Sequence, residues 1–168
     1  RNEDGDVIGR QYSALALGNI ASEIENHEEI VKLDGIDALI TLLKAEDVHS
    51  GRYAAFALSN IASNSNHRFQ IVEEGAIAPL VALACCDDQN AQRQALAALR
   101  GLAVSVENRP KIVKEGVLDP LVLMARSDNI EIQREVAAAL CSLSSVEDNK
   151  VEIADRSIST IITLSLSG

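Results

Sequence analysis

Two asparagines stand 41 residues apart, at the same point of two closely similar segments. Asn19 lies in "LALGNIAS" and Asn60 lies in "FALSNIAS". A carboxamide carries both a hydrogen-bond donor and an acceptor, so it can bind both polar groups of an extended peptide backbone. Amides in register among Leu, Ile and Ala therefore indicate peptide recognition. The structural alternative is that each amide satisfies a neighbouring backbone carbonyl.

Residues that share a helix face with these amides repeat at the same period, because positions three and four apart are neighbours on a helix. Four such lines are predicted to stand side by side as one binding surface: Tyr12, Leu15 and Asn19; Tyr53, Phe56 and Asn60; Gln94, Ala97 and Gly101; and Glu135, Ala138 and Ser142. Aromatic residues concentrate binding energy at interfaces. Since Tyr12, Tyr53 and Phe56 fall in the first two lines, we expect the N-terminal half to be the principal partner site.

The elements that must position these lines repeat without gaps at residues 10–22, 51–63, 92–104 and 133–145. Two apolar columns run through all four segments: Leu17, Leu58, Leu99 and Leu140, and three residues later Ile20, Ile61, Leu102 and Leu143. This spacing predicts an amphipathic helix whose apolar stripe faces the core. Gly101 costs about 1 kcal/mol inside a helix, so we expect close packing or the close approach of a ligand to explain it.

A second block follows each long helix and predicts a short helix and then a medium one. Asn26, Asn108 and Asn149 are predicted N-caps, with His67 in the same column. The predicted helix ends are Gly35, Gly75 and Gly116, where a left-handed cap favours glycine.

Composition limits the classes of function. The net charge is −10, so nucleic acid and anionic membranes are not expected as direct partners. Aromatic residues make up 2 % and Trp is absent, which favours close-packed helices over sheets. Cys85, Cys86 and Cys141 form no CxxC pair, and we expect small apolar fillers in a reducing compartment.

Catalytic chemistry is not indicated. The sequence has no Gly-rich phosphate loop, no GxSxG and no HExxH. We therefore predict no enzyme activity, no cofactor and no metal site. Three arginines, Arg52, Arg93 and Arg134, repeat beside the groove lines. They pair with acidic side chains or offer a basic rim to an acidic ligand, and the sequence leaves both possibilities open.

Three helices per 41 residues, with "EGAIAPLV" followed further along by "ALSNIAS"-type segments, resemble the armadillo repeat. "ENRPKIVKEGVLDPLV" is similar to the branch that includes plakoglobin and yeast vacuolar protein 8. The resemblance implies an all-α fold, a right-handed α-solenoid (superhelix) of three-helix repeats. It would form a single array over residues 1–168. The expected parts are a long helix at 7–22, complete repeats at 26–63, 67–104 and 108–145, and an incomplete repeat at 149–168.

The family resemblance implies a non-catalytic scaffold or adaptor that binds a protein or peptide in the concave groove lined by the long helices. Two alternatives stay open: an import-type adaptor that reads basic peptides, and a regulatory region of a larger protein such as a ubiquitin ligase. The groove lacks the Trp column of import adaptors. The chain starts at Arg1 without Met, so we expect a fragment. We expect it to act in the cytoplasm or at an organelle surface through segments not present here, and to self-associate through exposed repeat ends.

Overall fold

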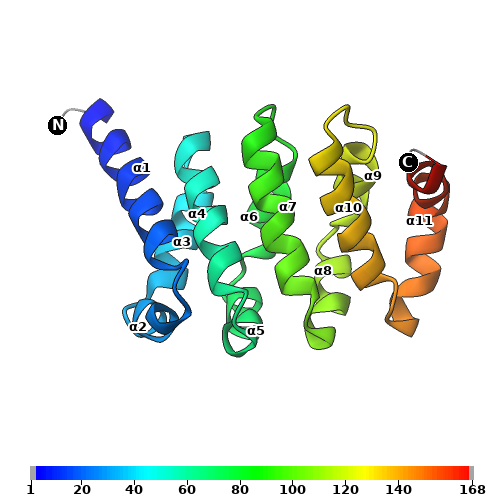
Figure 1. Cartoon of the computed structure of the whole chain (residues 1–168), viewed down its shortest axis with the longest axis horizontal. Coiled ribbons are helices and arrows are strands. Elements are labelled where there is room, and N and C mark those ends of the chain that lie inside the picture. Colours follow the sequence, from blue (N-terminus) through cyan, green and yellow to red (C-terminus); the bar gives the residue numbers. More distant parts are fainter. Residues whose placement is uncertain (1–2, 167–168) are drawn as a thin grey trace.

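The computed structural model describes residues 3–166, with side chains from residue 6 onward. The described residues form helices and turns without strands. Four long helices stand side by side: α1 (Glu3–Ile20), α4 (Val48–Ile61), α7 (Gln89–Ala103) and α10 (Ile130–Leu143) (Figure 1). The last three begin at residues 41 apart. The predicted all-helical solenoid is confirmed.

Shorter helices lie behind and below the long ones in Figure 1. They are listed here in chain order: η1 (Ile24–Asn26), α2 (His27–Lys32), α3 (Gly35–Leu43), α5 (Ser65–Glu73), α6 (Ile77–Ala84), η2 (Val106–Asn108), α8 (Arg109–Lys114) and α9 (Leu118–Met124). The last helix, α11 (Glu147–Leu166), is not short and stands at the end of the array beside α10 (Figure 1). The most extensive contacts join successive long helices, and each inner long helix also packs against the medium helix of its own repeat.

The two apolar columns build the core between repeats. Leu58, Leu99 and Leu140 are at most 2 % exposed, as predicted for residues that pack between neighbouring long helices. The same columns are less covered on α1, where Leu17 is half-buried and Ile20 is 48 % exposed. No helix precedes α1 in the described part of the chain, so this face has no partner there.

Acidic and amide side chains cap the N-termini of three long helices. Asp47, Asp88 and Asn129 accept hydrogen bonds from backbone N–H groups in the first turns of α4, α7 and α10. The predicted N-caps Asn26, Asn108 and Asn149 instead donate to the carbonyls of Ile20, Leu102 and Leu143, six residues earlier. They close the C-terminus of the preceding long helix, because an amide can donate as well as accept.

One column of residues separates each short helix from the medium helix that follows it. Asp34, Gly75 and Gly116 have φ values of 57°, 88° and 86°, in the left-handed region. The prediction of Gly35 as a helix end is therefore wrong by one residue. The fourth member is Ser157, which stays helical. Residues 147–166 consequently form the single helix α11, and not the predicted short and medium helices; residues 167–168 lie outside the described part.

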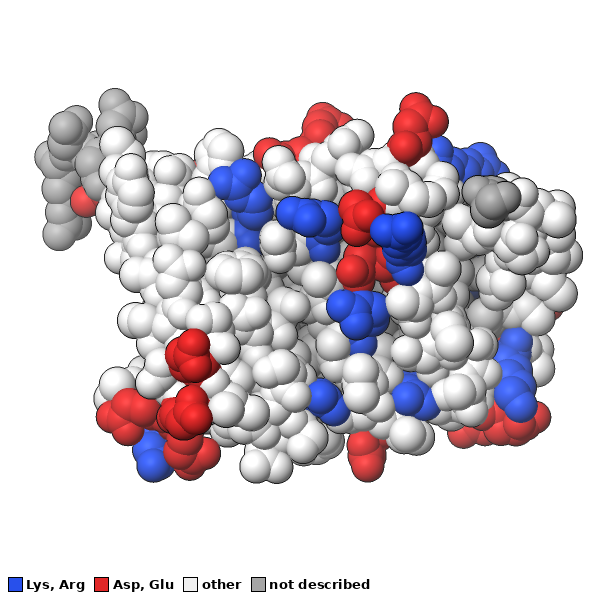
Figure 2. Space-filling model, in the orientation of Figure 1, with Lys and Arg blue, Asp and Glu red and all other residues white. Residues whose placement is uncertain are grey.

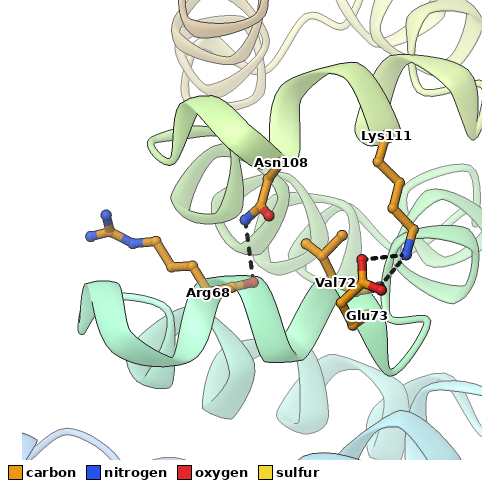
Figure 3. A network of polar contacts seen from close by, with 5 residues as sticks. All are labelled: Arg68, Val72, Glu73, Asn108 and Lys111. Carbon is orange, nitrogen blue, oxygen red and sulfur yellow. Dashed lines mark hydrogen bonds and ion pairs between the residues drawn. The ribbon is translucent and has the colours of Figure 1, made fainter.

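The joints between successive short helices differ. Between α5 and the segment formed by η2 and α8, the Asn108 amide donates to the Arg68 carbonyl at 3.2 Å, and Lys111 Nζ lies 3.0 Å from Glu73 Oε1 (Figure 3). Lys111 also donates to the Val72 carbonyl. The joint between α2 and α5 has no hydrogen bond or ion pair among the described residues. There the imidazole rings of His27 and His67 meet edge to face, with centroids 6.2 Å apart.

Candidate functional site

The four long helices present one continuous surface, which we call the long-helix face (Figure 2). At its N-terminal end lies a hollow of about 310 Å³, which we call the N-terminal pocket. Its lining residues come from α1, α4 and α7: Leu15, Asn19, Arg52, Tyr53, Phe56 and Gln94. Five of them were predicted from the helix-face spacing, so the structure brings together side chains from three repeats as expected. This volume lies at the lower end of the range for ligand pockets, roughly 300–1,000 Å³.

The seven other predicted site residues do not line this pocket. They are Tyr12, Asn60, Ala97, Gly101, Glu135, Ala138 and Ser142. Tyr12 is 69 % exposed and lies about two turns before Asn19 on α1. The remaining six are half-buried on α4, α7 and α10. Whether they contact a partner stays a prediction.

The two amides that prompted the peptide-binding hypothesis differ in their partners. The Asn60 nitrogen Nδ2 donates to the Gly18 carbonyl of α1 at 3.0 Å. This bond supports the structural alternative for Asn60, since it ties α4 to α1. Asn19 is exposed, and its side chain makes no hydrogen bond with any described residue. Its donor and acceptor are both free for a ligand.

Gly18 determines how closely a pocket residue, Phe56, packs against α1. A Cβ atom at this position would lie 2.5 Å from Cδ1 of Phe56, closer than carbon atoms approach one another. The absence of a side chain on Gly18 therefore lets the Phe56 ring lie directly against α1. The sequence carries a signal for this contact, because Gly18 replaces the larger residue that the next repeat has at the equivalent position, Ser59.

Gly101 does not have the same role. A Cβ atom there would meet only the Cβ of Ala62, at an ordinary contact distance of 3.5 Å. Close packing therefore does not require a glycine at this position. Of the two explanations expected for Gly101, the close approach of a ligand is the one that stays open.

Arg52 lines the pocket but is not among the site residues predicted from the helix-face spacing. It follows the same 41-residue column as Arg93 and Arg134, but the sequence did not show its partner. Its guanidinium donates to the Tyr53 hydroxyl at 2.8 Å and lies 4.7 Å from the centroid of the Tyr53 ring. A cation over an aromatic face is held by the quadrupole of the ring, so these two side chains form one wall of the pocket.

Two predicted groove residues in the C-terminal half of the face already have polar partners. Glu135, a predicted groove residue on α10, accepts from Arg100 Nε of α7 at 2.6 Å. Ser142 donates to the Ala138 carbonyl of its own helix at 3.1 Å. These groups already have partners, whereas Asn19 and Gln94 of the N-terminal pocket have none among the described residues.

The described histidines and cysteines belong to no metal-binding cluster. No group of three or more His, Cys, Asp or Glu side chains that could hold a metal ion is present within residues 6–166. His67 does not cap a helix as predicted; it is buried, and Asn64 caps α5 instead. Cys85 and Cys141 are exposed, so the prediction that the cysteines fill apolar space is wrong for these two.

Comparison with known families gives a match to part of the array. The family model described as Armadillo/beta-catenin-like repeat matches residues 64–104 and 105–145. This segment is therefore similar to two armadillo repeats. The matched segments contain α5 to α10, and their helices follow the same order that precedes them in α2, α3 and α4. The plakoglobin branch is not resolved by this match. Comparison with curated proteins gave no match.

Solved structures share the fold over most of the chain. Two engineered proteins match with TM-scores of 0.79 and 0.78 at 29 % and 31 % identity, each over 92 % of this chain. The chain spans 62 % and 61 % of their lengths. A designed armadillo repeat protein in complex with the peptide (KR)4 matches with a TM-score of 0.78 at 25 % identity, over 92 % of this chain and 63 % of that one.

No helix within residues 3–166 combines the length and the apolar character that a membrane span requires.

Proposed function

We propose that this chain is a non-catalytic interaction module that binds an extended polypeptide along the long-helix face. The observation that carries the proposal is the N-terminal pocket. It places the unpartnered amide of Asn19 beside the half-buried rings of Tyr53 and Phe56. Amides that can hold a peptide backbone and aromatic side chains that can anchor a partner are the ingredients of a peptide-binding surface.

The comparisons support a peptide as the class of ligand. A designed armadillo repeat protein with the same fold is complexed with a peptide. The match to armadillo repeats favours a scaffold or adaptor that forms a single array over its whole length. The free cysteines favour the cytoplasm as the compartment in which it acts. The structural role of a repeat fold does not name a partner, so the partner must be found by experiment.

The test is a selection of random peptides of about 12 residues, long enough to cross the four long helices. Peptides displayed on phage are selected on the immobilised 168-residue chain. The affinities of synthetic copies are then measured by fluorescence anisotropy. Tyr53→Ala should weaken binding by about tenfold or more, since aromatic anchors dominate interface energies.

Phe69→Ala is the matched control. Phe69 is also aromatic and is 59 % exposed, but it lies on α5, away from the long-helix face. Its substitution should leave the affinity within about twofold. Recovery of no binding peptide, or equal losses in the two variants, would contradict a binding site at the N-terminal pocket.

A further inference from the structure

The long-helix face carries a row of basic side chains although the molecule is acidic overall. Arg52 on α4, Arg93 on α7 and Arg134 on α10 occupy one column of the 41-residue repeat. Figure 2 shows basic side chains across the upper middle of this face, with acidic ones among them towards α10. Arg52 also lines the N-terminal pocket, so the row and the pocket are continuous.

The first two arginines of the row have no acidic partner among the described residues. Arg52 is bound to Tyr53 alone, and most of its five N–H donors are unused. Arg93 is exposed and makes no hydrogen bond or ion pair with any described residue. Arg134 pairs at 2.8 Å with Glu131 of its own helix, where both side chains are more than half exposed. Such a pair is weak and can be exchanged for another.

Acidic groups close to the row are held by other contacts. Asp47 accepts from Gln11 and from the backbone N–H groups of His49 and Ser50. Partial burial opposes its ionisation, but these hydrogen bonds win and lower the pKa of Asp47 below its ordinary value. Asp88 accepts from the Ala91 N–H of α7 in the same way. Their charges serve the N-termini of α4 and α7, and Glu135 is held by Arg100.

We propose that the polypeptide bound by this face is acidic, with carboxylates at about every third residue and an apolar side chain for the N-terminal pocket. Packed helices lie about 10 Å apart and an extended chain advances about 3.3 Å per residue. Carboxylates three residues apart in the peptide would therefore lie opposite successive arginines of the row. This inference rests on the proposed peptide-binding function and gives its ligand a charge.

The overall charge of −10 does not prevent this binding. Exposed charges are screened beyond about 8 Å at physiological salt, so a short peptide senses the row beneath it more than the distant acidic side chains. Many acidic side chains lie along the lower edge of the view in Figure 2, away from the row, and others lie at its upper edge and towards α10. A long polyanion such as a nucleic acid would extend past the row and meet them.

The experiment uses four fluorescent probes on the 168-residue chain. The first is a peptide of about 12 residues with Asp at every third position and one Phe. The second carries Lys in place of Asp, and the third has the same composition with its Asp residues clustered. The fourth is a single-stranded oligonucleotide. Fluorescence anisotropy at about 50 and 200 mM salt gives the affinity and its salt dependence.

We expect the spaced Asp peptide to bind most tightly and to weaken as the salt concentration rises. Arg93→Glu should weaken it by about fivefold or more, because an attraction becomes a repulsion. Lys114→Glu makes the same charge change on α8, where Lys114 is exposed and outside the long-helix face, and should change the affinity by less than about twofold.

Tighter binding of the Lys peptide or of the oligonucleotide would overturn the proposal, and so would equal losses in the two variants. If phage-selected peptides bind at the N-terminal pocket while the Asp peptide does not bind, the charge assignment is wrong and the peptide-binding function stands. If neither kind of peptide binds, the proposed function itself is wrong.

Discussion

At the scale of single residues, two equivalent asparagines have different partners in the folded chain. Asn60 holds the Gly18 carbonyl, whereas the Asn19 amide has no partner among the described residues. The repeat places both in one column, but within the described residues only Asn60 has a long helix on its N-terminal side to bind. Its equivalence to Asn19 in the sequence therefore does not extend to its contribution to stability.

We predict that Asn60→Ala lowers the free energy of unfolding by about 0.5–1.5 kcal/mol, the usual net value of one hydrogen bond. Asn19→Ala should change it by less than about 0.5 kcal/mol, because an exposed side chain without partners is removed. Urea titrations of both variants measure the difference. Equal effects on stability would show that the Gly18 bond contributes nothing.

A second residue-scale prediction concerns the buried imidazole of His67. Burial lowers the pKa of His67 below its ordinary value of 6.5, with Glu28 opposing and His27 adding to the shift. The folded state therefore keeps His67 neutral while the unfolded state takes up a proton. The unfolding free energy contributed by this group should fall as the pH drops below about 6.5.

His67→Asn should remove this pH dependence. It installs the residue that the other three repeats carry, and it offers the Ile61 carbonyl the amide donor that Asn26, Asn108 and Asn149 supply elsewhere. Urea midpoints at pH 7.5 and pH 5.5 give the comparison, with His49→Asn at an exposed site as the control. An undiminished loss of stability at low pH in His67→Asn would contradict the assignment.

At the scale of the helices, glycines in two long helices have opposite requirements. Gly18→Ala should displace the Phe56 ring, since the added Cβ would lie 2.5 Å from it. We expect lower stability and weaker binding of peptides selected on the unmodified chain. Gly101→Ala meets only an ordinary contact, so it should stabilise α7 by up to about 1 kcal/mol through helix propensity. Thermal unfolding of the two variants, which should shift in opposite directions, is the measurement.

The helices were predictable because their apolar columns recur four times. The column that contains Leu58 is enough to indicate the long helices, and its residues on α4, α7 and α10 are buried as an apolar column should be. The caps were assigned wrongly because Asn can donate as well as accept, so a conspicuous Asn after a helix suits either end. Asp34 can adopt a left-handed conformation as Gly75 does, which moved one helix boundary by a residue.

The candidate site was predictable in its face and less so in its contacts. Spacing of three and four residues placed Leu15, Asn19, Tyr53, Phe56 and Gln94 around one pocket. The Asn60–Gly18 hydrogen bond and the contact between Phe56 and Gly18 depend on how α4 crosses α1. Periodicity gives the face of a helix but not its distance from a neighbour.

At the scale of the whole molecule, both ends of the described array carry apolar hollows. One of about 360 Å³ lies beside Ile20 and Leu33 at the α1 end. Another of about 400 Å³ lies between α10 and α11, lined by Leu140, Ile161 and Leu164 among others. Apolar surface of this kind favours association.

We therefore predict that the 168-residue chain self-associates as its concentration rises. Ile162→Lys with Leu166→Lys should shift it towards the monomer, because these side chains are 55 % and 79 % exposed on α11. Val151→Lys is the control, at a site 72 % exposed near the start of the same helix. Light scattering over a concentration series decides; a monomer at every concentration, or an equal effect of the control, would contradict the prediction.

The unequal joints between short helices have a mechanical consequence. Polar cross-links brace α5 against α8, while α2 meets α5 through packing and the two imidazole rings. Among the short helices, a tensile load along the solenoid would therefore be resisted less by the first joint than by the second. The N-terminal pocket has walls from α1, α4 and α7, and these long helices make the most extensive contacts of the array. We therefore expect such a load to open the short-helix side of the solenoid before it reaches the pocket.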